Sequence, residues 1–266
     1  MDILHFTGYI LAILVGLSLG LIGGGGSILT VPILVYLMGI SPVLATQYSL
    51  FVVGLSSSFG AFNFYRLQLV SFPVAAYFGI PALVSILFTR RWLLPFLPHQ
   101  LFQVGEMWVT KDLLLMLLFA VLMIIASAKM IRSGKATDSN ESEADLRRFP
   151  LILLGLSVGF ITGLVGAGGG FLIIPALVFM AGLPIKKAVG TSLLIIAVNS
   201  LLGFWGSLSQ YTINWNVLLI FSALAVAGIY IGTALSQKIA GYRLRPIFGW
   251  FILVMGGYIL VHELFL

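Results

Sequence analysis

Residues 20–34 read GLIGGGGSILTVPIL, in which the four consecutive glycines 23–26 interrupt an apolar segment that ends in Pro32 and Leu34. Each glycine costs a helix about 1 kcal/mol relative to alanine, so four in a row predict a break. As one straight helix, residues 7–38 would reach about 48 Å at ~1.5 Å per residue, whereas the hydrocarbon core of a bilayer is ~30 Å thick. The segment is therefore predicted to be a helix broken at the glycines.

The same pattern occurs again 143 residues further on, as GLVGAGGGFLIIPAL in residues 163–177. The register holds without a gap from Val15 and Val158 to Gly60 and Gly203, and it keeps Gly, Pro and Ser aligned. Apolar low complexity alone would match Leu to Val, but it would not keep Gly, Pro and Ser in register. We infer an internal duplication of the kind found in secondary transporters. Its parts are a first half at 1–132, a connector at 133–148 and a second half at 149–266.

The composition indicates an integral membrane protein. Hydrophobic residues make up 60% of the chain and charged residues 8%, with a mean hydropathy of +1.14, whereas an average soluble domain has about 25% charged residues. Apolar runs of helix length predict an all-α polytopic fold and exclude an outer-membrane β-barrel. The chain has no cysteine, which excludes disulfides and thiolate metal sites. The basic residues sit at predicted helix ends, which argues against a nucleic-acid partner.

Besides broken elements at 7–38 and 150–182, the hydropathy pattern predicts six ordinary spans. They are residues 43–62, 70–89, 111–131, 187–206, 215–236 and 245–264. Each half thus has one broken element and three spans. The connection at 90–110 is longer and partly amphipathic, with Trp92 and Trp108 as interfacial anchors. The polar segment 133–148 is predicted to be a flexible connector.

The placement of charge predicts how the broken elements are threaded. If each crossed the membrane once, the fourteen Lys and Arg would divide eight against six. If each returned as a hairpin, only Arg90, Arg91 and Lys111 would lie on one side, which the positive-inside rule favours. A hairpin plus three spans gives an odd number of crossings, so the two halves become inverted repeats. Both termini are then extracytoplasmic, the connector is cytoplasmic, and the two glycine breaks meet near the midplane.

Since almost no ionisable residue lies within the spans, a ligand site there must use other groups. A half-helix that begins at each break has free backbone N–H groups and the positive end of its dipole, which together favour an anion. The predicted substrate-binding residues are Gly23, Gly24, Gly25, Gly26, Ser27, Gly166, Gly168, Gly169 and Gly170 at the breaks, with Ser49, Thr191, Ser192 and Asn199 nearby. Further candidates are Gln47, Ser56, Ser57, Thr162 and Ser200, and Arg66 is a candidate gate or recruiting charge.

Each of these residues also has a purely structural interpretation. Gly16, Gly20, Gly159 and Gly163 have the small-xxx-small spacing that allows close helix packing. Ser and Thr within spans usually bond to their own helix backbone, and an arginine at a helix end is commonly a positive-inside anchor. An intramembrane enzyme would need a nucleophile and base or metal ligands, and the sequence has no H-E-x-x-H motif. We therefore predict a transporter without catalytic residues, metal or cofactor.

The duplicated G-x-x-G-x-G-G-x-x-x-x-x-P-x-L pattern, in a chain of this length with a polar central loop, resembles the TauE/SafE family of sulfite and organosulfur-anion exporters. The resemblance covers nearly the whole chain. It implies a permease of the cytoplasmic membrane for a small sulfur-containing anion, such as sulfite or sulfoacetate, with H⁺ or Na⁺ as coupling ion. An anion channel, or a transporter of small carboxylates, is the alternative. Two features depart from the pattern: Ala167 replaces Gly24, and the 90–110 connection has no counterpart in the second half.

Overall fold

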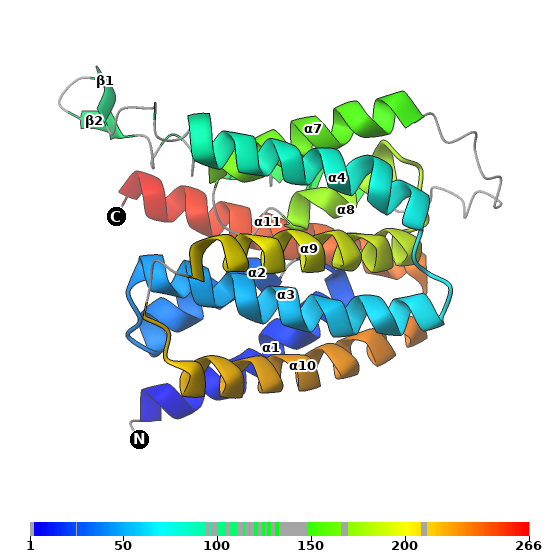
Figure 1. Ribbon diagram of the computed structural model, residues 1–266, viewed down its shortest axis with the longest axis horizontal. Coiled ribbons are helices and arrows are strands. Elements are labelled where there is room, and N and C mark those ends of the chain that lie inside the picture. Colours follow the sequence, from blue (N-terminus) through cyan, green and yellow to red (C-terminus); the bar gives the residue numbers. More distant parts are fainter. Residues whose placement is uncertain are drawn as a thin grey trace.

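The chain folds into a bundle of long helices (Figure 1). The computed structural model describes residues 3–24, 26–93, 96, 100–104, 107–110, 148–165, 170–208 and 212–265, with ten helical positions between 114 and 132. The first half contains α1 (Ile3–Ile22), α2 (Gly26–Pro32), the π-helical turn η1 (Ile33–Leu37), α3 (Pro42–Arg66), α4 (Phe72–Phe88) and η2 (Thr89–Leu93). The second half contains α7 (Arg148–Val165), α8 (Gly170–Phe179), α9 (Ile185–Ser207), α10 (Trp215–Lys238) and α11 (Gly241–Phe265).

The described helices have the length and surface of membrane spans. Three stretches are long and apolar enough to cross a bilayer, namely Phe72–Leu93, Ile185–Gly206 and Trp215–Lys238, and shorter apolar helices cover Thr7–Ile22 and Phe149–Leu164. Large apolar side chains also cover the outside of the bundle, where Ile80 is 62% and Trp205 77% exposed. Exposed apolar side chains of this kind suit a lipid environment. The predicted helical, multi-pass membrane fold is confirmed.

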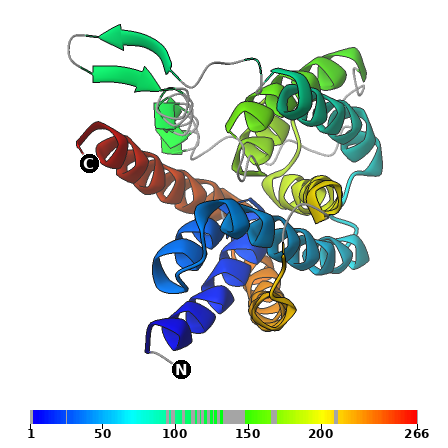
Figure 2. The ribbon, with the colours of Figure 1, turned by 60° about the vertical axis from the view of Figure 1, so that its left-hand side comes forward.

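The long connection after η2 contains a β-hairpin that the sequence analysis did not predict. Strand β1 (Gln100–Val104) pairs antiparallel with β2 (Met107–Thr110), so that Val104 lies opposite Met107. Both strands are rich in aromatic and branched residues, which favour extended backbone. The hairpin stands apart from the helix bundle (Figure 2). Most of the span predicted at 111–131, and the connector up to residue 147, lie outside the described residues.

The first broken element is a hairpin. A Cβ atom built on Gly26 would lie 2.6 Å from the carbonyl oxygen of Val15, and one on Gly8 would lie 2.8 Å from Cγ of Met38. The chain after the break therefore runs back along α1 toward its start. The reversal begins at Gly23, whose φ of +75° is a conformation that other residues rarely adopt.

The two broken elements end in the same way. Gly39 and Gly182, which are repeat partners, have φ values of +64° and +67°. The amide of Ile40 donates to the carbonyl of Leu34 at 3.0 Å, and the equivalent amide of Leu183 donates to Leu177 at the same distance. The duplication seen in the sequence is therefore also present in the backbone.

The two halves interlock through reciprocal contacts. Helix α1 packs against α10 and α7 against α4, while α3 packs against α9. A Cβ on Gly16 would meet the backbone of Ala225, and a Cβ on its repeat partner Gly159 would meet the backbone of Ala82. Because Ala82 and Ala225 are themselves repeat partners, the two contacts exchange when the halves are exchanged. The two contacts have the reciprocity that a pseudo-two-fold relation between the halves would produce.

Equivalent helices run in opposite directions through the bundle. The α3–α4 and α9–α10 connections lie at opposite ends of the molecule (Figure 1). At one end, the hydroxyl of Tyr48 on α3 accepts a hydrogen bond from the amide of Asn214, just before α10, at 2.6 Å. At the other end, the ammonium of Lys186 on α9 donates to the carbonyl of Gln237 on α10 at 3.1 Å.

Basic residues gather at the second of these ends, which we call the cationic end. Helix α7 runs parallel to α4, since Gly155 lies against Phe78 and Gly163 against Ile86. The start of α7 therefore lies at the same end as the start of α4. The cationic end holds Arg66, Arg148, Lys186, Lys187, Lys238 and Arg243. The opposite end, which we call the far end, receives Arg90 and Arg91 of η2.

Candidate functional site

The two glycine breaks approach each other in the interior. A Cβ on Gly170, the first residue of α8, would lie 3.7 Å from Cα of Gly24. One on Gly23 would lie 2.8 Å from Oγ of Ser192 on α9. All four residues are buried. Of the other residues predicted at the breaks, Gly26 is buried at the start of α2. The remainder lie outside the described residues, namely Gly25, Gly166, Gly168, Gly169 and the side chain of Ser27.

A cavity of about 70 Å³ lies beside this meeting point. Its polar lining comes from α3, α7, α8 and α9, as Ser49, Thr162, Gly170, Asn199 and Ser200. Its apolar lining is Leu50, Val53, Leu83, Ile86, Leu87, Ile173, Ile196 and Gly203. A single water needs about 10–15 Å³ of such space, so a small polyatomic ion fits. The lining residues lie in the early part of α3 and in the late parts of α4 and α9. The cavity is therefore nearer to the far end than to the cationic end.

The chemistry of the cavity favours an anion that is held without a counter-charge. None of the described residues that line it is ionisable. Helix α8 begins at Gly170, so its first amides lack partners within the helix and the positive end of its dipole lies at the cavity wall. The hydroxyl oxygen of Thr162 is buried and has no hydrogen-bond partner. A ligand with several acceptor oxygens would satisfy both the hydroxyl and the amides.

Two predicted residues of α9 do not line the cavity. The hydroxyl of Ser192 donates to the carbonyl of Val189 at 2.8 Å. The hydroxyl of Thr191 donates to the carbonyl of Lys187 at 2.7 Å and accepts from the amide of Ser71 at 3.0 Å. For both residues, the structural interpretation describes the observed bonds, because each hydroxyl is engaged with the protein backbone.

Arg66 is also remote from the cavity. It is exposed at the cationic end of α3, where its guanidinium carbon lies 5.0 Å from the centroid of the Phe62 ring. This position fits an anchor at the membrane surface rather than a ligand-binding group.

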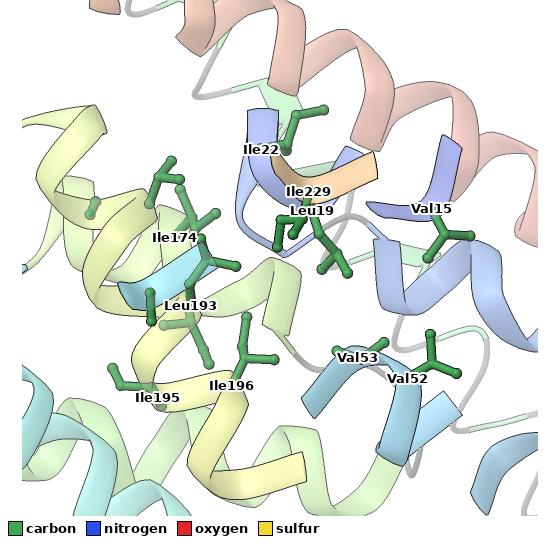
Figure 3. Close-up of a cluster of buried hydrophobic side chains, with 14 of the residues drawn as sticks. Val15, Leu19, Ile22, Val52, Val53, Ile174, Leu193, Ile195, Ile196 and Ile229 are labelled. Carbon is green, nitrogen blue, oxygen red and sulfur yellow. The ribbon is translucent and has the colours of Figure 1, made fainter. Parts of the chain in front are cut away.

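Sequence reasoning missed the apolar floor of the cavity. Val53 and Ile196 both line it, are buried, and are repeat partners on α3 and α9. Both belong to the cluster of buried apolar side chains in Figure 3. Apolar residues within a membrane span carry no ligand signal of their own. The signal that could have found them is the repeat register, which places Val53 and Ile196 midway between the paired polar positions of α3 and α9.

Comparison with known proteins gives a consistent result. Residues 9–259 match the family model described as sulfite exporter TauE/SafE. The chain is 28% identical over 252 residues to a probable membrane transporter protein of Xylella fastidiosa, covering 93% of this chain and 91% of the relative. It is 29% identical over 269 residues to one of Methanocaldococcus jannaschii, covering 94% and 95%, and 28% identical over 255 residues to one of Bacillus subtilis, covering 93% and 96%. No solved structure matches the chain.

Proposed function

The chain belongs to the TauE/SafE sulfite exporter family, and we propose that it carries a small sulfur-containing anion across the cytoplasmic membrane by alternating access. Sulfite and sulfonates such as sulfoacetate are the expected substrates. They are compact, negatively charged and rich in acceptor oxygens, as a cavity lined by backbone amides and hydroxyls requires. Taurine and small carboxylates share parts of this chemistry and serve as comparisons.

One observation carries the proposal. The start of α8 at Gly170, the unpartnered hydroxyl of Thr162 and the polar side chains of Ser49 and Asn199 surround one cavity. These groups stabilise negative charge through dipoles and donors rather than through an ion pair. A substrate held in this way can also leave, because no opposite charge has to be separated from it.

The distribution of basic residues supports an orientation in the membrane. By the positive-inside rule, the cationic end with Arg66, Lys186 and Lys238 is cytoplasmic. The start of α1 and the cavity then face the extracytoplasmic side. The opposite directions of α3 and α9 (Figure 1) support the proposal that the two halves are inverted repeats about the cavity region. H⁺ or Na⁺ is the proposed coupling ion.

The floor of the cavity favours a transporter over a channel. Val53 is 2% and Ile196 4% exposed, and no charged side chain is among the described residues that line the cavity with them. An anion in the cavity would have to cross this apolar layer to reach the cationic end. A rearrangement of helices can open a path through the layer, whereas a fixed pore cannot. Counterflow exchange of labelled anion would demonstrate the rearrangement.

The test is thermal unfolding of the purified protein in detergent against sulfite, sulfate, thiosulfate, sulfoacetate, taurine and simple carboxylates. A ligand that binds only the folded state stabilises it by about 2.7 kcal/mol at one hundred times its Kd. We expect a raised unfolding temperature with at least one sulfur anion. The absence of a shift with every sulfur anion, or a shift with carboxylates only, would overturn the substrate assignment.

Variants locate the binding site. Ser49→Ala removes a hydroxyl from the cavity wall and is expected to weaken affinity by about 1.5–3 kcal/mol, the contribution of a hydrogen bond to a charged group. Ser157→Ala is the matched control, because that exposed hydroxyl bonds to Leu153 in its own helix. Equal affinity in the two variants would exclude this cavity as the site.

A further inference from the structure

Each polar side chain that α3 and α9 contribute to the cavity has a repeat partner on the other helix. Ser49 corresponds to Ser192, Asn199 to Ser56 and Ser200 to Ser57. The packing of α3 on α9 follows the same exchange, since Gly60 lies against Leu193 and Gly203 against Leu50. The pseudo-two-fold relation therefore places Ser56, Ser57 and Ser192 together, on the cationic side of Val53 and Ile196. We call these three residues the second cluster.

The second cluster differs from the cavity in its exposure. Ser56, Ser57 and Ser192 are each 0% exposed, whereas Asn199 and Ser200 are partly exposed. The hydroxyl oxygens of Ser56 and Ser57 have no hydrogen-bond partner. Burying a hydroxyl without a partner costs free energy, so two adjacent ones in a well-packed interior need an explanation. A ligand that occupies this place in another conformation would supply the missing partners.

The packing beside Gly60 and Gly203 shows what closes the second cluster. A Cβ on Gly60 would lie 2.6 Å from Cδ1 of Ile229 and 3.1 Å from Cδ1 of Leu193. A Cβ on Gly203 would find only Leu50, at 3.5 and 3.8 Å. Ile86, the repeat partner of Ile229, lines the cavity together with Gly203 but is not within 4 Å of a Cβ on Gly203. Helix α10 is thus packed onto α3 at the cationic end, while α4 is separated from α9 at the far end.

We propose that Ser56, Ser57 and Ser192 form a second anion-binding half-site, which is closed in this structure by Ile229 against Gly60. When Ile229 moves away from Gly60, the half-site opens toward the cationic end. Ile86 then meets Gly203 and closes the present cavity. The anion passes from Ser49, Asn199 and Ser200 to Ser56, Ser57 and Ser192 past the Val53–Ile196 pair. This inference rests on the proposed function, because it takes the ligand to be the transported anion.

The absence of cysteine from the chain makes the inference directly testable. Single substitutions Ser57→Cys and Ser200→Cys each introduce one thiol. Each variant is expressed in right-side-out and inside-out membrane vesicles and treated with a membrane-impermeant methanethiosulfonate. Gln68→Cys, exposed at the cationic end, and Thr212→Cys, exposed at the far end, report which side each vesicle presents.

The Ser200→Cys variant is expected to react only from the side on which Thr212→Cys reacts. The Ser57→Cys variant is expected to react only from the side on which Gln68→Cys reacts. If Ser57→Cys does not fold, Ser56→Cys takes its place, with the same expected result. Reaction of Ser57→Cys from the side of Thr212→Cys would overturn the second half-site. So would no reaction of Ser57→Cys and Ser56→Cys from either side while Ser200→Cys reacts. The readout needs no knowledge of the substrate, so failure of the anion panel and failure of this proposal are separate results.

Discussion

The α1–α10 pair and the α4–α7 pair occupy equivalent places in the two halves, yet they are built differently. In the first pair, both helices present glycine: Gly16 lies against the backbone of Ala225, and Gly228 lies against the backbone of Ile13. In the second pair, α7 keeps its glycine, but α4 has Ser85 where α10 has Gly228. In the first pair both helices place a glycine against the partner's backbone, whereas in the second only α7 does so, through Gly155 and Gly159, and α4 contributes a side chain instead.

This difference follows the position of the cavity. Leu83, Ile86, Leu87 and Thr162, which line it, come from the α4–α7 pair, whereas Ile229 of α10 closes the second cluster. The contact from Ser85 to α7 is a hydrogen bond, from its hydroxyl to the carbonyl of Leu156 at 2.9 Å. The two pairs have therefore diverged at this position, and the pair with the side-chain hydrogen bond borders the open space.

The largest effect is expected from adding a methyl group between α1 and α10. In Gly16→Ala and in Gly228→Ala the new Cβ would meet backbone atoms of the partner helix, which cannot turn aside. Overpacking of this kind costs about 1–3 kcal/mol or more, and a large drop in unfolding temperature in detergent is expected. Gly206→Ala is the control, because its Cβ would meet nothing within 4 Å. Equal unfolding temperatures of Gly16→Ala and Gly206→Ala would contradict the close approach of α1 and α10.

A smaller effect is expected at the corresponding position of the second pair. Ser85→Ala removes one hydrogen bond between α4 and α7 without adding volume, which should cost about 0.5–1.5 kcal/mol. The measurement is the same thermal unfolding series, with Ser157→Ala as the variant that loses only a bond within α7. A cost for Ser85→Ala as large as that of Gly228→Ala would remove the contrast between the two pairs.

The smallest effect is expected at the end of the α4–α7 contact. Thr89 is fully buried, its hydroxyl has no partner, and its Cβ lies 2.7 Å from where a Cβ on Gly163 would be. Thr89→Val keeps the shape and removes the unpaired hydroxyl, so unfolding should be unchanged or shifted upward by up to ~1 kcal/mol. Clear destabilisation by Thr89→Val would show that the hydroxyl takes part in a bond that stabilises the folded protein.

The backbone plan was predictable from the sequence because its signals are local or repeated. Consecutive glycines oppose a helix whatever surrounds them, and the chain turns back at the first break, so that Met38 lies beside Gly8. The packing interpretation of Gly16, Gly20, Gly159 and Gly163 is also confirmed, since each lies against a helix of the other half. The β-hairpin was not predicted, because its two short strands lie in a connection that has no repeat partner.

The arrangement of side chains could be predicted only in part. Nothing in the sequence separates Asn199, which lines the cavity, from Thr191 and Ser192, whose hydroxyls bond to backbone carbonyls. It also could not show that Ile229 touches Gly60 while Ile86 stands away from Gly203. A duplicated sequence describes both ends alike, and the difference between them belongs to one conformation of the chain.

The interlocking of the halves has a consequence for biogenesis. Helix α1 leaves the ribosome well before its packing partner α10, which begins only at Trp215. In the same way, α4 is synthesised before its packing partner α7. Such long-range pairings are slow to form, and the glycine surface of α1 stays uncovered in the membrane until α10 has been inserted. Each half alone lacks the helices that cover it, so the repeat is a unit of sequence but not a unit of folding.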